Sequence, residues 1–196
     1  AHAIHERGQR KKRPMRCLNC GAIPSQLIES ALFGHERGAF TGADKKQRGV
    51  FEEAEGGTVL LDEIGELSPQ AQTAFLRVLE TKRITRVGSS VEIPVNVRIL
   101  AATHCDLENM CNQGTFRWDL YYRLNVIPIN IPPLRKRRED ILLLAEHFIE
   151  KYSARMGKKD IRIAPEAIEL LVSFNFPGNV RELENTIERA LALSGE

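Results

Sequence analysis

Buried runs and helical periodicities alternate along the first two thirds of the sequence. The run at 58–61 is typical of a central parallel strand, and 95–103 predicts a second buried strand. Residues 126–131 alternate well enough to predict another strand, although an internal proline restricts its pairing. Segments 83–87 and 91–95 flank a Gly-Ser-Ser turn and predict a hairpin. Because strands alternate with helices, we expect an α/β layered domain.

Helices are predicted in the intervals between these strands. Residues 26–33 indicate a short helix that ends at Gly34, where a glycine commonly terminates a helix. Ser68 is expected to cap a longer helix, because a serine followed by a proline is a frequent helix start. The apolar face of this longer helix comprises Ala71, Ala74, Phe75, Val78 and Leu79.

The pattern changes after the two prolines near residue 133, beyond which we expect helices and no strand. Apolar residues on one helical face over 141–152 indicate the first helix. Pro165 marks the start of the second, and Asn179 with Glu182 as a capping box marks the start of the third. The sequence therefore predicts an α/β core over 1–132 and a three-helix lid over 133–196.

Composition and charge are those of an ordinary globular protein. The chain has 196 residues, of which 42% are hydrophobic and 28% charged, and its net charge is +2. This balance favours a globular enzyme or regulator over a disordered or fibrous chain. No apolar run approaches the ~20 residues that a membrane span needs, and the start is not a signal peptide. We therefore expect no membrane contact and a cytoplasmic location.

The amino-terminal residues and the cysteines carry weaker signals. Residues 1–5 are interpreted as the tail of a helix, and the basic run at 7–16 as a solvated loop in preference to a nucleic-acid patch. Cys17 and Cys20 have a zinc-like spacing, but no turn glycine lies between them, and the second cysteine pair is spaced too widely for a zinc knuckle. Reduced, partly buried thiols are expected instead.

Two adjacent acids follow the predicted central strand. Asp62 and Glu63 stand at its carboxyl end, where open α/β sheets bind ligands. Because adjacent strand residues point to opposite sides, one carboxylate can hold a hydrated Mg²⁺ while the other polarises a water molecule. The alternative is a turn acid and a cap for the next helix.

A pliable segment of small residues surrounds one aromatic ring and one hydroxyl. Its residues are Gly38, Ala39, Phe40, Thr41, Gly42 and Ala43. The glycines allow a sharply bent backbone, so that Phe40 can stand at the tip of a loop. An exposed aromatic is suited to gripping a partner, whereas the alternative is a turn whose ring folds back into the core.

Several other polar residues have both a structural and a functional interpretation. Asn19 can be a satisfied core amide, and Arg117 and Arg123 can form surface ion pairs. Thr103 can be a simple strand former. Arg181 stands out, because a cation in the first turn of a helix is disfavoured by the helix dipole unless an anion lies nearby.

As a string, GAFTGA preceded by Leu-Phe-Gly-His-Glu resembles the signature of the sigma-54-dependent transcription activators, the bacterial enhancer-binding proteins. Gly-Gly before the predicted strand and Ile-Gly-Glu-Leu after Glu63 resemble the Walker B segment of the same AAA+ family. The resemblance covers nearly the whole chain. It implies an AAA+ type layered α/β core with a parallel sheet plus a carboxyl-terminal three-helix lid.

The resemblance also implies a role for each candidate residue. Asp62 would coordinate Mg²⁺, Glu63 would activate water, and Asn19 would hydrogen-bond Glu63 and link nucleotide state to the GAFTGA loop. Arg117 and Arg123 match arginine fingers that reach a neighbouring subunit. Thr103 and His104 match sensor I, Arg181 matches a sensor II residue that contacts the γ-phosphate of ATP, and the loop 38–43 would touch the sigma factor.

The resemblance further implies partners: the sigma-54 RNA polymerase holoenzyme, a homo-oligomeric ring (hexamer or heptamer in the family), and DNA through a domain absent here. No G-x-x-x-x-G-K-[ST] phosphate loop occurs in the sequence, and Ala31 stands where the family usually has an acid. We therefore expect a fragment that begins inside its first helix and has little ATPase activity alone. The competing hypotheses are a non-catalytic sigma-54-binding module and a basic-arm nucleic-acid binder.

Overall fold

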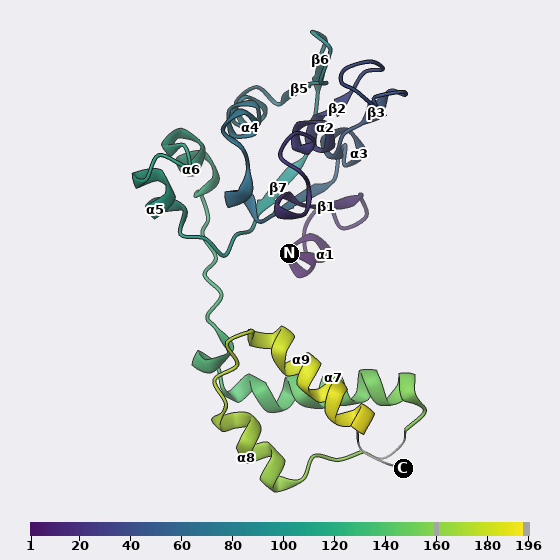
Figure 1. The fold of residues 1–196 in the computed structure, drawn as a ribbon, viewed down its shortest axis with the longest axis vertical. Coiled ribbons are helices and arrows are strands. Elements are labelled where there is room, and N and C mark those ends of the chain that lie inside the picture. The colour runs from purple at the N-terminus through teal and green to yellow at the C-terminus, as the bar shows by residue number, and fades with distance from the viewer. Residues whose placement is uncertain (159–160, 194–196) are drawn as a thin grey trace. The chain divides into compact units, whose positions relative to one another are not determined.

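The computed structural model describes residues 1–158 and 161–193 and divides into two compact units (Figure 1). The first unit spans 1–128 and the second 129–196. The division falls a few residues before the boundary predicted from the sequence.

A parallel sheet forms the centre of the first unit. Its strands are β1 (Met15–Asn19), β4 (Thr58–Asp62) and β7 (Arg98–Ala101), in the order β1-β4-β7. The predicted central strand is confirmed: β4 pairs with both neighbours, and Val59 and Leu61 are fully buried. The strand predicted at 95–103 is shorter than expected, because the Val95 amide donates to the Lys82 carbonyl and not to β4.

Helices pack against this sheet through their apolar faces. They are α2 (Ile28–Phe33), α3 (Val50–Glu53) and α4 (Pro69–Thr81). The Ser68 hydroxyl accepts a hydrogen bond from the Ala71 amide at 3.3 Å, which confirms the predicted cap. The helix predicted at 26–33 ends at Gly34 as expected, where φ is +82°. The largest fully buried side chains of this core are Ile28, Leu32, Phe51, Leu61, Ile64, Phe75, Ile84 and Leu120.

Two antiparallel pairs lie beside the sheet. One joins β2 (Gly34–His35) to β3 (Gln47–Arg48), and the other joins β5 (Arg83–Thr85) to β6 (Glu92–Pro94). The second pair confirms the predicted hairpin with shorter strands. Backbone hydrogen bonds connect the two pairs: the Val87 amide donates to the Gly34 carbonyl, and the Val87 carbonyl accepts from the Glu36 amide.

The remaining elements of the first unit are short: α1 (His2–Glu6), η1 (Cys20–Ala22), η2 (Ile64–Glu66), α5 (Leu107–Asn112) and α6 (Trp118–Leu124). The helix expected at the amino terminus is confirmed by α1. Between α1 and β1, the basic run forms turns, as predicted. Arg10 is engaged within the fold, because its guanidinium donates to the Gly57 carbonyl at 2.9 Å and to the Asn96 carbonyl at 2.8 Å.

The strand predicted at 126–131 is wrong. These residues form no helix or strand, and their apolar side chains are 66–80% exposed. Two prolines, Pro128 and Pro132, flank the last part of the segment, and neither can donate a ladder hydrogen bond. A segment with an alternating pattern forms a β-strand only where a partner strand can pair with it. This segment joins the two units and pairs with no strand among the described residues.

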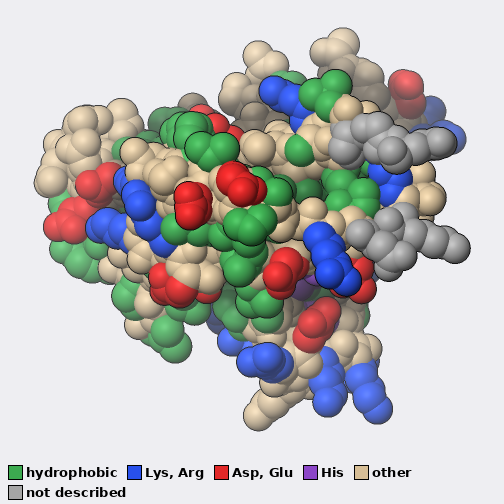
Figure 2. Space-filling view, turned by 90° about the horizontal axis from the view of Figure 1, so that it is seen from below, with side chains coloured by type: hydrophobic (Ala, Val, Ile, Leu, Met, Phe, Trp, Pro, Cys, Tyr) green, Lys and Arg blue, Asp and Glu red, His purple; other side chains and the backbone are tan. Residues whose placement is uncertain are grey.

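The second unit is built from helices, as predicted: η3 (Leu134–Lys136), α7 (Glu139–Met156), α8 (Pro165–Ser173) and α9 (Asn179–Leu193). Its buried core comprises Leu134, Ile141, Ala145, Phe148, Tyr152, Phe176, Leu183, Ile187 and Leu191. On the face seen in Figure 2, exposed hydrophobic side chains alternate with acidic and basic ones. Among the described residues, no helix has the length and apolarity that crossing a bilayer requires.

The predicted cap of α9 needs correction. Asn179 has φ of +53°, and its side-chain oxygen accepts from the Leu134 amide at 2.9 Å. In a capping box with Asn179 as the cap, the Glu182 carboxylate would accept from the Asn179 amide. It accepts instead from the amide of the preceding residue, Gly178, at 2.8 Å. The asparagine therefore ties η3 to α9.

Candidate functional site

The carboxyl ends of the three parallel strands bring several candidate residues to one edge of the sheet. Asn19 is paired in register with Asp62 at the ends of β1 and β4. After β7, the Ala102 amide donates to the Leu61 carbonyl at 2.8 Å, and the Ala102 carbonyl accepts from the Ile64 amide at 3.0 Å. Since these bonds hold the chain after β7 against the end of β4, residues 103–105 lie beside the two acids.

Glu63 has an unusual backbone conformation at this edge. Its φ and ψ are 55° and 49°, the left-handed region that non-glycine residues seldom occupy. Its amide donates to a carboxylate oxygen of Asp62 at 3.1 Å. The other end of the residue is fixed as well, because its carboxylate lies 2.5 Å from Nδ1 of His104. Strained backbone at a candidate catalytic position is typical of functional sites.

The hydrogen bond implied for Asn19 is not the one observed. The Asn19 side chain accepts from the Ala22 amide at 3.0 Å and so caps η1. Within the described residues, the side chain that bonds Glu63 is His104. Asn19 nevertheless remains close, since a Cβ placed on Gly21 would lie 3.5 Å from Asn19 Oδ1 and 3.7 Å from Glu63 Cβ. The Ala22 amide uses the acceptor oxygen of Asn19, whereas a bond to the Glu63 carboxylate would use the side-chain NH2 group of Asn19.

The segment that follows β7 contributes three polar side chains. Thr103 uses its hydroxyl to accept from the Cys105 amide at 3.0 Å. His104 is 72% exposed and bridges two groups, with Glu63 on Nδ1 and the Cys105 sulfur 3.6 Å from Nε2. The sequence pointed to Thr103 and His104, whereas it gave no signal for Cys105.

Arg117 and Arg123 lie at opposite ends of α6. The Arg117 amide donates to the side chain of Gln72, which is buried, and its guanidinium forms two bonds with Asp119 at 2.9 and 2.5 Å. Hydrogen bonding from Arg117 lowers the pKa of the Asp119 carboxyl. Arg123 is exposed in the last turn. The two arginines therefore do not occupy equivalent surroundings.

The same helix carries an exposed aromatic pair that the sequence analysis did not predict. The rings of Trp118 and Tyr122 stack with centroids 5.5 Å apart, and they are 37% and 67% exposed. Their i, i+4 spacing could have signalled the pair. Arg181 lies in the second unit, exposed in the first turn of α9, whereas the two acids belong to the first unit.

The loop 38–43 stands on the stem formed by β2 and β3. Phe40 is half-buried, and its ring meets the ring of His35 edge-on with centroids 5.0 Å apart and an interplanar angle of 64°. Thr41 is exposed, while Ala43 is buried and its amide donates to the Phe40 carbonyl at 3.0 Å. Gly38 donates to the Ala43 carbonyl at 2.8 Å and closes the loop. The ring thus rests on the base of its own loop and belongs to neither hydrophobic core cluster.

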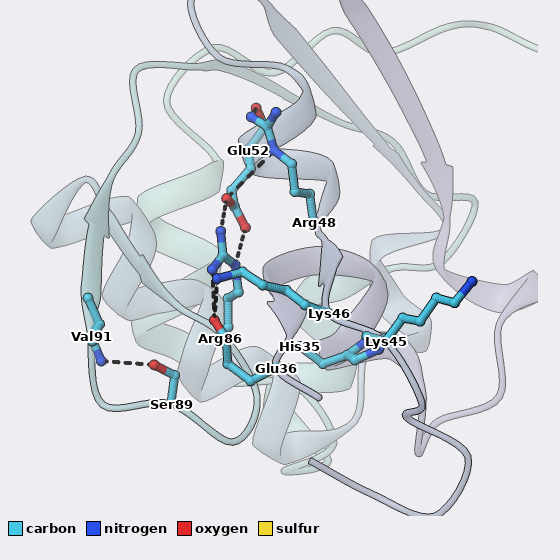
Figure 3. Close-up of polar contacts among 9 residues, drawn as sticks. All are labelled: His35, Glu36, Lys45, Lys46, Arg48, Glu52, Arg86, Ser89 and Val91. Carbon is cyan, nitrogen blue, oxygen red and sulfur yellow. Dashed lines mark hydrogen bonds and ion pairs between the residues drawn. The ribbon is translucent and has the colours of Figure 1, made fainter. Parts of the chain in front are cut away.

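Charged side chains hold the loop end of this stem and connect it to neighbouring elements (Figure 3). Arg86 comes from the β5–β6 hairpin and donates to Glu52 at 2.7 and 2.5 Å and to Glu36 at 2.8 Å. Lys46 approaches the same Glu36 carboxylate at 2.9 Å. Hydrogen bonds from Lys46 and Arg86 lower the pKa of the Glu36 carboxyl. The network links the hairpin, α3 and both strands of the stem.

His35 gives the stem a second anchor. Its Nδ1 lies 2.7 Å from the Ser30 hydroxyl on α2, and its Nε2 lies 3.0 Å from the Lys45 carbonyl. The residue is 6% exposed. The imidazole therefore joins α2 to the returning arm of the loop while its ring supports Phe40, so the loop is presented by a braced base.

Comparisons with known proteins agree with this arrangement. Residues 1–130 match the family described as the Sigma-54 interaction domain, and 135–196 match the AAA+ ATPase lid domain. The transcriptional regulatory protein ZraR of Escherichia coli K12 is 52% identical over 98% of this chain and 44% of its own length. The nitrogen fixation protein AnfA of Azotobacter vinelandii is 50% identical over the whole chain and 37% of its own length.

A solved structure of NtrX from Brucella abortus superimposes with a TM-score of 0.91 and 38% identity, covering 98% of this chain and 43% of that one. NtrX has also been solved with ADP and with ATP. The chain spans less than half the length of these relatives. The parallel sheet, the GAFTGA loop and the helical unit, together with these matches, show that the chain belongs to the sigma-54 interaction domain family of AAA+ transcription activators.

Proposed function

We propose that this chain is the part of a transcription activator that contacts sigma-54 and couples ATP hydrolysis to remodelling of the sigma-54 RNA polymerase holoenzyme, leading to open-complex formation. The observation that carries the proposal is the braced GAFTGA loop. It presents the exposed Thr41 and the half-buried Phe40 on a stem that two glutamates, two cations and a buried histidine hold in place. A partner can pull on such a loop without unfolding its base.

The acids at the sheet edge fit a nucleotide-bound Mg²⁺. Among the described residues no three His, Cys, Asp or Glu side chains gather to hold a metal ion by themselves. Mg²⁺ at a nucleotide needs only one or two carboxylates in addition to phosphate oxygens and water, and Asp62 can supply one. Bound there, the ion would neutralise phosphate charge. The sequence itself has no phosphate loop, so we expect this chain to release phosphate from ATP at well under ~1 per second.

Glu63 would orient the attacking water, and four further residues are proposed to lie at the nucleotide: Asn19, Thr103, His104 and Arg181. In the structure the Glu63 carboxylate is bonded to His104, so it must leave that partner to act on water. Arg117 and Arg123 would reach the site of a neighbouring subunit in a ring, because a guanidinium suits a transferring phosphoryl group. Arg117 would first have to leave Asp119.

Cytoplasmic action follows from the proposed partner, and DNA would be bound by another domain of the activator. The alternative of a nucleic-acid-binding basic arm is less well supported, since Arg10 is engaged with backbone carbonyls of its own fold. In the other alternative, the chain binds sigma-54 without hydrolysing ATP. The loop would then keep its proposed role, and only Glu63 would have no catalytic role.

The test is retention of this purified chain by immobilised sigma-54. Phe40→Ala and Thr41→Ala should each reduce retention at least about tenfold, a loss of about 1.4 kcal/mol that is ordinary for an interface anchor. Phe174→Ala is a matched control, because Phe174 is also half-exposed and also contacts one ring edge-on, that of Phe176. Thr73→Ala on α4 controls for Thr41. No retention of the unsubstituted chain, or equal retention of Phe40→Ala and Phe174→Ala, contradicts the proposal.

A further inference from the structure

Three side chains at the carboxyl edge of the sheet form a continuous chain of contacts. The Cys105 sulfur lies 3.6 Å from Nε2 of His104, and Nδ1 of the same imidazole lies 2.5 Å from a carboxylate oxygen of Glu63. The proposed function uses Glu63 and places His104 at the nucleotide, but it gives the thiol no task. A thiol, an imidazole and a carboxylate in this order are the arrangement of an activated cysteine nucleophile.

The positions of the protons follow from the neighbours. An ionised Glu63 carboxylate can only accept, so Nδ1–H of His104 donates to it. The Nε2 atom then carries a lone pair and faces the thiol, which donates its S–H. The carboxylate thereby holds the imidazole in the tautomer that accepts a proton from sulfur, which is the role of the third member of a catalytic triad.

The other cysteines lack this arrangement. Burial raises the pKa of the Cys20 thiol to about 11, and burial also raises the pKa of the Cys111 thiol. Cys17 is exposed, whereas Cys105 is only partly exposed. In the described part of the chain Cys17 has no hydrogen-bond partner for its side chain. If solvent exposure decided reactivity, Cys17 would be the most reactive thiol. If a neighbouring base decides it, Cys105 is the most reactive, because it contacts His104.

We propose that Cys105 is an oxidation site for small hydroperoxides, activated by His104 and Glu63. The thiol proton passes to Nε2, and the sulfur attacks one oxygen of the peroxide. An S–O bond forms as the O–O bond breaks, the sulfur loses two electrons, and the peroxide is reduced. The leaving hydroxide, or the alkoxide of an organic hydroperoxide, takes the proton from Nε2 and departs as water or an alcohol, leaving Cys105 as a sulfenic acid that a thiol reductant can reduce back to the thiol.

The oxidation has a consequence for the neighbouring acid. A sulfenic acid on Cys105 adds a polar oxygen beside the imidazole that holds Glu63, and a mixed disulfide formed from it adds more bulk. Either product changes the position of His104. If Glu63 orients water as proposed, oxidation would alter ATP turnover in the activator, and this effect alone depends on the proposed function.

The test measures the four thiols of the unsubstituted chain side by side. The chain is exposed to a small excess of hydrogen peroxide with dimedone, which traps sulfenic acids, and each cysteine peptide is quantified over time by mass spectrometry. Cys105 should be labelled faster than Cys17 by about tenfold or more, in line with the contribution of a positioned base. Cys20 and Cys111 should remain unlabelled.

Two variants separate activation from exposure. His104→Gln removes the base, and Glu63→Gln removes the group that orients it; each should lower labelling of Cys105 about tenfold and leave Cys17 unchanged. Because the His104 side chain is 72% exposed, its replacement should not affect folding, which a thermal melt checks. The proposal is overturned if Cys17 is labelled faster than Cys105. It is also overturned if neither substitution changes the rate at which Cys105 is labelled. Neither result bears on sigma-54 or ATP, which the assay does not contain.

Discussion

Arg86 is the residue whose removal should disturb the GAFTGA stem most. Its side chain is 13% exposed and donates to two carboxylates, of which Glu52 is 7% exposed and Glu36 32% exposed. Arg86→Met keeps much of the volume and removes the charge and all donors. The substitution leaves the Glu52 carboxylate buried without its two closest hydrogen bonds.

The magnitude can be worked from these contacts. Breaking a buried ion pair by removing one partner costs about 3–5 kcal/mol. Arg48 remains 3.7 Å from the Glu52 carboxylate and offsets part of this cost, and the solvent-screened contact with Glu36 adds little. We therefore expect a loss of about 3 kcal/mol in the free energy of unfolding of the first unit. The double variant Glu52→Gln with Arg86→Met should recover a part of it, because it no longer buries a charge.

The assay is urea unfolding followed by the fluorescence of the single tryptophan, Trp118, which reports on the first unit. Arg83→Met is the matched control on the same hairpin. Its guanidinium lies 3.6 Å from Glu92, with both side chains about half exposed, and its loss should cost less than about 1 kcal/mol. Equal losses for Arg86→Met and Arg83→Met would refute the reasoning that burial makes the Arg86 network important.

Other substitutions test the loop and its base. Phe40→Ala should cost about 1–2 kcal/mol in urea unfolding, because a half-buried ring keeps one edge-on contact, against about 3–5 for the fully buried Phe51→Ala; equal costs would place Phe40 in the core. The lowered pKa of Glu36 contributes stability above the ordinary carboxyl pKa, which is lost as pH falls toward the lowered value. Glu36→Gln should therefore flatten the acid side of a melting-temperature profile, and an unchanged profile contradicts this. Gly34→Ala should prevent folding of the stem, seen as a lost melting transition, since a Cβ there would lie 2.6 Å from the Gln47 carbonyl.

The sequence alone determined what depends on near neighbours along the chain. The Ser68 cap, the end of α2 at Gly34, the central strand β4 and the lid helices all follow from spacing within a few residues, and all are confirmed. The GAFTGA string and the acids after β4 were sufficient to indicate the family, because a specific order of residue types is itself local information.

Tertiary structure decided which polar groups meet. His104 and not Asn19 bonds Glu63, because parallel strands bring segments distant in sequence to one edge of the sheet. Likewise Arg86 reaches Glu52 from a hairpin that no spacing rule connects to α3. The wrong strand at 126–131 has the same origin, since a β-strand requires a partner that only the folded sheet can provide.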